Sequence, residues 1–203
     1  MRELLLVRHG LAGSNRDGLA SCTPPGEGLT AEGVEQARFL AHELASVEIS
    51  AAVTSRFART QETLELALDG RDVAIEIVPE LDEIHFGSYD CGLLETYRAW
   101  AASSPPDALP PGAGESRAHG AARFARGLRA VLARPGERVL LVGHALAIRY
   151  WIDAAAGLVP AARMAPVAHA SPYRLTYDEA ERAAGVLEDW SIAPRFRDPS
   201  IEG

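Results

Sequence analysis

Short apolar runs alternate with segments of helical periodicity along most of this chain. The first run, 4–7, consists of four consecutive aliphatic residues, which is typical of a strand buried on both faces of a sheet. A similar run over 138–143 predicts a second buried strand, and the segments 49–54 and 73–78 have the length and residue types of further strands. Helical periodicity predicts helices over 30–46, 57–68, 116–133 and 145–156.

The order of these signals predicts an α/β fold. Repeated strand–helix units are typical of a three-layer α/β/α sandwich with a mostly parallel central sheet. We expect a single domain over 1–203, because a chain of 203 residues can bury a substantial core and no linker or internal repeat divides it. Towards the carboxyl end, 173–177 and 184–190 suggest a hairpin at the sheet edge, and four prolines between 103 and 114 predict a loop.

Composition narrows the partners that the chain is expected to bind. Its 28 acidic residues outnumber 20 basic ones, and this net charge of −8 argues against a nucleic-acid binder. No apolar run approaches the roughly 20 residues of a membrane-spanning helix, and the start of the chain does not have the form of a signal peptide. The two cysteines, Cys22 and Cys91, are too few for a disulfide framework or a metal site, so we expect a cytoplasmic protein.

Two histidines stand where buried strands are expected to end. Arg8 and His9 follow the run 4–7, and His144 follows the run 138–143. Open α/β sheets place ligand crevices at the carboxyl ends of their strands, so the two histidines can share one crevice if their strands are neighbours. An arginine there can bind an anion and a histidine can act as nucleophile or proton carrier, a combination that suits phosphoryl chemistry.

The alternative is that each histidine is an ordinary hydrogen-bonded loop residue. For the pair together this alternative weakens, because packing does not require a histidine at the end of each strand. The other four histidines do not have this placement, and we expect them to be ordinary residues: His42, His85, His119 and His169.

Charged side chains gather in two further segments. Arg56 and Arg59 stand where a strand gives way to a helix, and the backbone N–H groups and dipole of a helix start favour an anion. One of these two arginines is expected to lie on a solvated helix face. Asp82 and Glu83 lie in a loop, where a partly desolvated carboxylate can hold a proton near neutrality, although an ordinary acidic loop is the alternative. Because the chain contains no lysine, Schiff-base chemistry and a P-loop are excluded.

The order of the motifs resembles that of the histidine phosphatase superfamily, in its phosphoglycerate-mutase-like branch. Each motif is weak alone, but six in register through most of the chain are specific. They are Arg8-His9-Gly10 with Asn15, Leu29-Thr30-Ala31-Glu32-Gly33 with Gln36-Ala37, Ser55 with Arg59-Thr60 and Thr63, Leu81-Asp82-Glu83 with Phe86-Gly87, Gly114-Glu115-Ser116, and Val142-Gly143-His144. The resemblance implies the phosphoglycerate-mutase-like sandwich.

The resemblance also implies a role for each matching residue. His9 would attack phosphorus and become a transient phosphohistidine, which requires a neutral ring with a free nitrogen lone pair. Arg8, Arg59 and His144 would surround the phosphoryl group, and Asn15 would add a hydrogen bond. Their positive charge would stabilise a transition state whose charge spreads over three equatorial oxygens.

Glu83 would complete the implied site as general acid and then general base. It would protonate the leaving alcohol and then activate the water that hydrolyses the phosphohistidine. No metal and no cofactor is implied, because arginines take the place of a cation. The implied substrate is small and phosphorylated, covered by an insertion at about 93–115 that contains Tyr97 and Trp100. Arg56 does not match the arginine position of the family, so we expect it at the protein surface or at the rim of the site.

The chain departs from the family pattern at several positions. Leu11-Ala12 replaces a usual Glu-Thr, which removes a hydroxyl near the expected phosphate pocket. Gly143 and Ala145 flank the second histidine where the family usually has Ser or Thr and then Gly, and Cys91 occupies a usual glycine. Pocket polarity and loop shape are therefore open. For Cys22, we expect a buried inert thiol.

Three functions remain open at this point. A phosphatase acting on small phosphorylated metabolites is favoured over a phosphoglycerate mutase. In mutases a tyrosine stands where this chain has Phe86, and a lysine and an arginine pair follow, whereas 95–114 contains only Arg98. A phosphate-binding regulatory protein without catalysis is the third function. The sequence is compatible with either a monomer or a homodimer.

Overall fold

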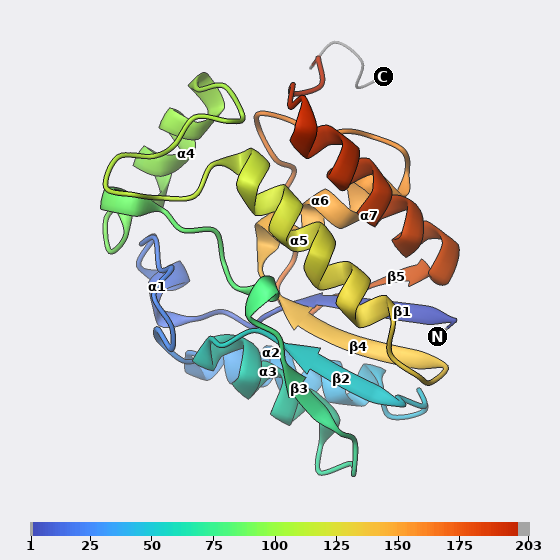
Figure 1. Ribbon diagram of the computed structural model, residues 1–203. Helices are drawn as coiled ribbons and strands as arrows, with labels where there is room; N and C mark the ends of the chain where they lie inside the picture. The colour runs from blue at the N-terminus through green and yellow to red at the C-terminus, as the bar shows by residue number, and fades with distance from the viewer. Residues whose placement is uncertain (1, 199–203) are drawn as a thin grey trace.

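A mostly parallel sheet forms the centre of the protein. In the computed structural model, which describes residues 2–198, this sheet contains five strands in the order β3-β2-β4-β1-β5 (Figure 1). The strands are β1 (Glu3–Arg8), β2 (Ala51–Thr54), β3 (Ile75–Ile77), β4 (Arg138–Gly143) and β5 (Pro172–Thr176). The pairs among β1 to β4 are parallel, and β5 runs antiparallel to β1 at one edge.

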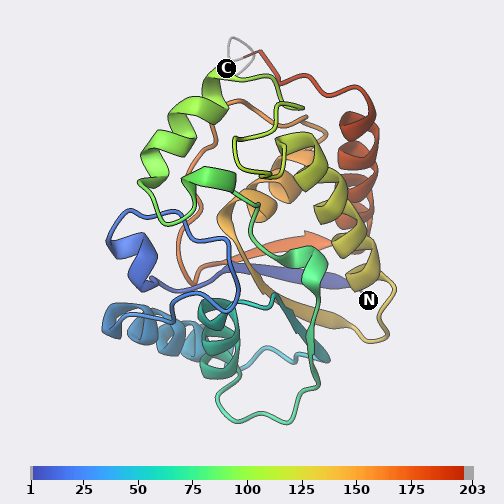
Figure 2. The same ribbon diagram turned by 60° about the vertical axis from the view of Figure 1, so that its left-hand side comes forward.

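Helices cover both faces of this sheet, which confirms the predicted three-layer α/β/α sandwich (Figures 1 and 2). One face carries α2 (Ala31–Glu43) and α3 (Ala58–Leu68). The other carries α5 (Arg117–Leu132), α6 (Ala145–Ala155) and α7 (Tyr177–Ile192). The remaining helical segments are shorter: α1 (Gly13–Arg16), η1 (Pro79–Leu81), η2 (Gly87–Tyr89) and α4 (Leu94–Ser103).

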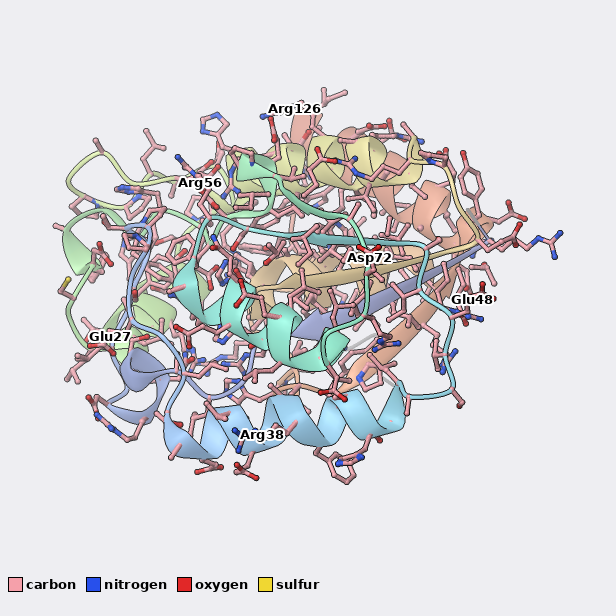
Figure 3. All side chains as sticks on the ribbon, turned by 90° about the horizontal axis from the view of Figure 1, so that it is seen from below. Glu27, Arg38, Glu48, Arg56, Asp72 and Arg126 are labelled. Carbon is pink, nitrogen blue, oxygen red and sulfur yellow. The ribbon has the colours of Figure 1, made fainter. Side chains whose placement is uncertain are left out.

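Burial of the strands on both faces explains their continuous apolar runs. Successive side chains of a strand point to opposite faces of the sheet. On β1, Leu4 and Leu6 therefore pack in the core beneath α5, α6 and α7, and Leu5 and Val7 pack in the core beneath α2 and α3. The helices are correspondingly two-sided: on α2, Leu40 is buried against the sheet and the exposed Arg38 points outwards (Figure 3).

The register of β1 against β4 sets the position of both strand ends. Arg8 lies opposite Gly143 in this parallel pair. The backbone N–H of His9 continues the ladder by donating to the carbonyl of Gly143 at 3.0 Å. His9 and His144, which directly follow the paired residues, therefore leave the sheet at the same edge.

The hairpin predicted near the carboxyl end is wrong in its second half. The first segment, 173–177, coincides with β5, but 184–190 lies within α7. Thr176 and Glu179 form a capping box that starts this helix. The buried positions of the helix are spaced three and four residues apart, as in a helix and not a strand: Ala180, Ala183, Ala184, Leu187 and Trp190.

The insertion at 93–115 is only partly a loop. Its first half forms α4, in which Tyr97 and Ala101, four residues apart, are buried on the same face. The prolines that follow prevent a longer helix and lead the chain back to Ser116, whose hydroxyl caps α5 by accepting from the N–H of His119.

The start of α2 makes unusually close backbone contact with the segment that follows β1. A Cβ atom added at Gly33 would lie 2.2 Å from the carbonyl oxygen of Leu11, and one added at Gly10 would lie 2.6 Å from that of Gly33. Thr30 caps α2 and also donates to the carbonyl of Leu11 at 3.0 Å, and Gln36 accepts from the N–H of Leu11 at 2.9 Å. This helix start therefore fixes the backbone next to His9.

We expect Gly33→Ala to destabilise the protein by roughly 1–3 kcal/mol, because the new methyl group would overlap the Leu11 carbonyl. The matched control is Gly185→Ala in α7, where the nearest atom to a new Cβ lies 3.8 Å away. This control should raise stability by up to about 1 kcal/mol, since alanine is the better helix former. Urea unfolding of both variants measures the difference, and equal stability of the two would contradict the expectation.

Candidate active site

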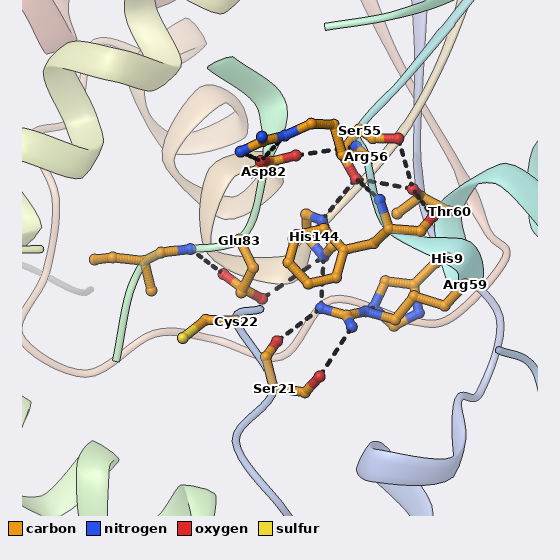
Figure 4. Close-up of polar contacts among 12 residues, drawn as sticks. His9, Ser21, Cys22, Ser55, Arg56, Arg59, Thr60, Asp82, Glu83 and His144 are labelled. Carbon is orange, nitrogen blue, oxygen red and sulfur yellow. Dashed lines mark hydrogen bonds and ion pairs between the residues drawn. The ribbon is translucent and has the colours of Figure 1, made fainter. Parts of the chain in front are cut away.

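His9 and His144 lie side by side at the carboxyl edge of the sheet, as the strand register requires. Their ring centroids are 5.5 Å apart, and 2% and 0% of the two residues is exposed. Arg59, in the first turn of α3, lies between them (Figure 4). Its Nε donates to Nε2 of His9 at 3.2 Å and a terminal nitrogen donates to Nδ1 of His144 at 3.3 Å. Three of the predicted site residues therefore meet in one cluster.

The environment of His9 keeps a lone pair on Nε2. Nδ1 lies 2.7 Å from the carbonyl oxygen of Gly10, which can only accept, so Nδ1 carries the ring proton. Burial, with help from Arg59 and Arg8, lowers the pKa of His9 well below its ordinary value. The ring is therefore neutral near pH 7, and its unprotonated nitrogen faces the guanidinium of Arg59.

A chain of hydrogen bonds fixes the ring of His144. Because a guanidinium only donates, Nδ1 of His144 accepts from Arg59 and Nε2 carries the proton. Nε2 lies 2.9 Å from Oγ of Ser55, which lies 2.8 Å from Oγ1 of Thr60, and Thr60 donates to the carbonyl of Phe57 at 2.8 Å. Burial and the charge of Arg59 lower the pKa of His144 well below its ordinary value, so this ring is also neutral.

The guanidinium of Arg59 is held from several directions. It donates to the carbonyl of Ser21 at 3.0 Å and lies over the ring of Phe57, 4.3 Å from its centroid. The residue is 2% exposed and no carboxylate pairs with it directly among residues 2–198, so its charge is available to an anion that enters the site. Burial lowers its pKa, and the charge of Glu83 partly offsets this effect.

Arg8 and Asn15 offer polar groups that the folded chain leaves unused. Arg8 donates to the carbonyl of Val167 at 2.8 Å, but its Nε has no hydrogen-bond partner within the part of the chain that the structure describes. The same holds for the buried Oδ1 of Asn15. Burial lowers the pKa of Arg8 to about 10, so it remains charged at neutral pH. Buried polar groups without partners are costly, and here both residues line a cavity.

Glu83 brings a carboxyl group to the histidine pair. Its Oε2 lies 3.8 Å from Nδ1 of His144, and its Oε1 accepts from the N–H of Ile84 at 2.9 Å. Only 14% of the side chain is exposed. Burial raises the pKa of Glu83, although the charges of Arg59 and Arg8 oppose this effect. A carboxyl group that keeps its proton at higher pH than usual is suited to donate it.

One end of a cavity of about 390 Å³ is lined by Arg8, His9, Asn15, Arg59 and Glu83, and His144 lies behind this lining. Its farther walls come from α4, with Leu94 and Tyr97, and from the loop 162–167 with Met164. Phe86 packs edge-on against Tyr97, with ring centroids 4.6 Å apart, and extends the apolar wall. The cavity therefore joins a polar end with basic side chains to a region in which apolar and aromatic side chains stand beside Arg98 and Arg163. Among residues 2–198, no group of three or more His, Cys, Asp or Glu side chains is arranged to hold a metal ion, and no helix is long and apolar enough to cross a membrane.

Comparison with known proteins gives the family of this chain. The histidine phosphatase superfamily (branch 1) matches the chain over residues 4–189. The chain belongs to this superfamily. An adenosylcobalamin/alpha-ribazole phosphatase of Escherichia coli (strain K12) is 38% identical over 106 residues, which are 48% of this chain and 52% of that protein. The chain therefore matches about half the length of this relative.

Two longer matches support the same assignment. A probable phosphoglycerate mutase GpmB of Cronobacter sakazakii is 30% identical over 166 residues, 78% of this chain and 76% of that protein. The crystal structure of a putative alpha-ribazole-5'-P phosphatase from Escherichia coli K-12 superimposes with a TM-score of 0.76 at 30% identity, covering 86% of this chain and 90% of that one.

The departures from the family pattern fall mostly outside the cavity. Leu11-Ala12 and Gly143 do not line it, whereas Ala145 does. Cys91 has a backbone φ of 62°, a left-handed conformation that favours the glycine usual at this position. The thiol of Cys22 accepts from the N–H of Phe86 at 3.2 Å. Burial raises its pKa to about 12, as expected for an inert thiol.

In each of the two charged segments, one residue belongs to the site and the other, Arg56 or Asp82, does not line the cavity. Arg56 is turned away from the histidines and pairs with Asp82, its terminal nitrogen 2.6 Å from Oδ2 (Figure 4). Its backbone N–H donates to Oδ1 of Asp82 at 2.9 Å. Asp82 thus anchors the strand end while the adjacent Glu83 reaches the site, and Arg56 is the partly solvated residue that the sequence predicted.

His169 lies beside His9, contrary to the expectation that it stands away from the strand ends. Its ring centroid lies 5.6 Å from that of His9, and its Nδ1 lies 2.7 Å from the carbonyl oxygen of His9. No apolar run delivers it to the strand ends, so the rule that found His9 and His144 could not find it. The signal is its place just before β5, which becomes informative only once β5 is known to pair with β1. The exposed His42 and His119 lie outside the site as expected.

We expect Glu83→Gln to be more stable than the wild type at pH 7. The raised pKa means that the fold favours the protonated carboxyl, so ionisation costs stability as the pH rises above the ordinary value of 4.5. Glutamine imitates the protonated form and does not bear this cost. The difference in stability between the variant and the wild type should disappear as the pH falls below 4.5. Urea unfolding at several pH values measures it, with the exposed Glu65→Gln on α3 as control. A wild type that is the more stable protein at pH 7 would contradict the raised pKa.

Proposed function

We propose that this protein hydrolyses phosphomonoesters of small metabolites through a phosphohistidine on His9. The observation that carries the proposal is the unprotonated Nε2 of a neutral, buried His9, directed into a cluster with Arg59 and His144 at the end of a cavity. A neutral imidazole with a free lone pair is a nucleophile, and permanently charged guanidiniums bind phosphate oxygens.

In the first step, Nε2 of His9 forms a bond to phosphorus while the bond from phosphorus to the ester oxygen breaks. Arg8 and Arg59 contact the equatorial oxygens, where negative charge spreads in the transition state. Glu83 transfers its proton to the leaving oxygen, so that an alcohol departs instead of an alkoxide. Its raised pKa and its position 3.8 Å from His144 support this role.

In the second step, water replaces His9 on phosphorus. Glu83, now a carboxylate, accepts a proton from the water as it attacks, and the bond from nitrogen to phosphorus breaks. Inorganic phosphate leaves, and His9 and the protonated Glu83 are restored. The arginines supply the positive charge in both steps, so the proposed mechanism requires no metal ion and no cofactor.

The walls of the cavity indicate which esters fit. Phe86, Leu94, Tyr97 and Met164 offer apolar and aromatic surface beyond the phosphoryl end. We therefore infer a substrate whose alcohol part carries an apolar or aromatic group. The similarity to proteins named alpha-ribazole phosphatase supports hydrolysis of a phosphorylated substrate.

A phosphoglycerate mutase is the second candidate, favoured by the relatives named probable phosphoglycerate mutase GpmB. Phe86 and the segment 95–114 support it less. Phe86 packs against Tyr97 without a hydroxyl to offer, and within 95–114 only Arg98 supplies a basic side chain. Holding a sugar-acid carboxylate and retaining the phosphorylated enzyme are both harder without that hydroxyl and without a further basic side chain in this segment. A phosphate-binding protein without catalysis is the third candidate, and it would never form phosphohistidine.

We expect the wild type to hydrolyse 4-nitrophenyl phosphate and His9→Ala to lose at least about 10³-fold in kcat/KM, because the nucleophile is gone. Acid-labile, alkali-stable phosphoprotein should appear after rapid quenching of the wild type only. The exposed His42→Ala is the control and should retain full activity.

The same preparation separates the three candidates. Release of inorganic phosphate from benzyl phosphate at about tenfold higher kcat/KM than from glycerol phosphate would support the inferred substrate. Isomerisation of 3-phosphoglycerate without release of phosphate would favour the mutase. Phosphate binding without any trapped phosphohistidine would leave only the binding protein.

We expect Glu83→Gln to affect substrates according to their leaving group. An alkyl phosphate needs the proton and should lose about 10²–10³-fold in kcat/KM, whereas 4-nitrophenyl phosphate should lose less than about tenfold. Asp82→Asn, which alters the neighbouring carboxylate outside the cavity, should change both substrates equally. An equal loss for both substrates in Glu83→Gln would argue against the general-acid role.

A further inference from the structure

His169 reaches the nucleophile from a part of the chain that the proposed mechanism does not use. It lies between α6 and β5, where the chain returns to the sheet beside the end of β1. The N–H of the next residue, Ala170, donates to the carbonyl of Arg8 at 2.8 Å. This backbone contact delivers the side chain of His169 to His9.

The side chain of His169 makes two contacts with His9. Its Nδ1 lies 2.7 Å from the carbonyl oxygen of His9, and because a carbonyl only accepts, this nitrogen carries the proton and donates. Its ring meets the ring of His9 edge-on, with centroids 5.6 Å apart and planes inclined at 60°. One bond thus holds the main chain of the nucleophile, and one ring supports the side chain.

The other bonds to this short segment come from different elements. The N–H of His9 is held by Gly143 of β4 at 3.0 Å, and the N–H of Gly10 donates to Oγ1 of Thr63 on α3 at 2.9 Å. Within residues 2–198, the hydrogen bond to the His9 carbonyl comes from the side chain of His169. Without it, the peptide between His9 and Gly10 would be held on one side only, through the Gly10 N–H. The Gly10 carbonyl that orients the ring of His9 belongs to the next peptide along the chain.

We propose that His169 is a positioning residue that fixes the main chain and ring of His9 so that Nε2 faces the phosphoryl group. This inference rests on the proposed function and adds a residue to it. Misplacing a reacting atom by about 1 Å can cost up to about 10²-fold in rate, so a single buttressing contact is enough to matter.

The charge state of His169 also acts on His9. Burial, together with the charge of Arg8, lowers the pKa of His169, so its ring is neutral near pH 7. In acid, a charged His169 would repel a charged His9, and this repulsion helps to keep the nucleophile unprotonated. The charged and titratable groups around it are Arg8, His9, Tyr173 and, along a groove shared with α2, Glu32, Glu35 and Glu43.

Removal of His169 should therefore raise the pKa of His9. A higher pKa means that His9 becomes protonated, and loses its lone pair, at a higher pH. The acid limb of the kcat/KM profile should move to higher pH in any variant without this imidazole. A role limited to stability would not move this limb.

The test compares His169→Ala and His169→Asn with the exposed control His42→Asn, using 4-nitrophenyl phosphate. We expect His169→Ala to lose roughly tenfold in kcat with little change in KM. His169→Asn should stay within about threefold of the wild type, because its amide can still donate to the His9 carbonyl. Both should shift the acid limb upward, and His42→Asn should change neither quantity.

An NMR titration of the His9 imidazole provides a readout that does not depend on turnover. An upward shift of the His9 pKa in His169→Asn supports the inference even if the wild type hydrolyses no ester, an outcome that would defeat only the proposed function. The inference is overturned if the wild type is active and His169→Ala retains its kcat and its acid limb. It is also overturned if the His9 pKa is the same in the wild type and in His169→Asn. A third contrary outcome is that His169→Ala and His169→Asn reduce kcat equally and otherwise only lower the unfolding midpoint.

Discussion

Parallel pairing of β1 with β4 is the constraint on which the rest of the site depends. Because Arg8 lies opposite Gly143, the next residue on each strand is a histidine, and the two rings stand 5.5 Å apart. A slip of one residue would turn every side chain of one strand to the opposite face, removing both the continuous core and the meeting of the rings. The burial that stabilises the sheet thereby also fixes the distance between His9 and His144.

The same burial determines the charges in the site. Water is excluded from both imidazoles, so the permanent charges of Arg8 and Arg59 keep them neutral, and Glu83 is the nearby carboxyl that these charges influence. Two cations, two neutral rings and a carboxyl that resists ionisation leave an excess of positive charge. An entering phosphate dianion would balance it, which links the cost of burying the arginines to the affinity for the ligand.

Most of the fold could be predicted because strand burial on both faces leaves a strong signal in the sequence. The strand-end histidines followed from the same signal, whereas Arg59 and Glu83 were distinguished from Arg56 and Asp82 only through the family's motifs. Two features depended on information that the local pattern does not carry. The segment 184–190 is too short for its apolar positions to separate a strand from a helix, and the capping box at Thr176 decides for a helix. His169 is placed by the antiparallel pairing of the edge strand, which is a tertiary property.

The two ends of the cavity are built from different parts of the fold, and this difference has an evolutionary consequence. Its reactive end rests on the ends of buried strands and on the backbone contact between Gly10 and Gly33, where almost any substitution disturbs the core. Its far wall consists of α4 and the loop 162–167, which stand outside the sheet. Mutations at the exposed positions of this wall cost folding little, so descendants of one ancestor can diverge in the esters they accept while inheriting the same chemistry.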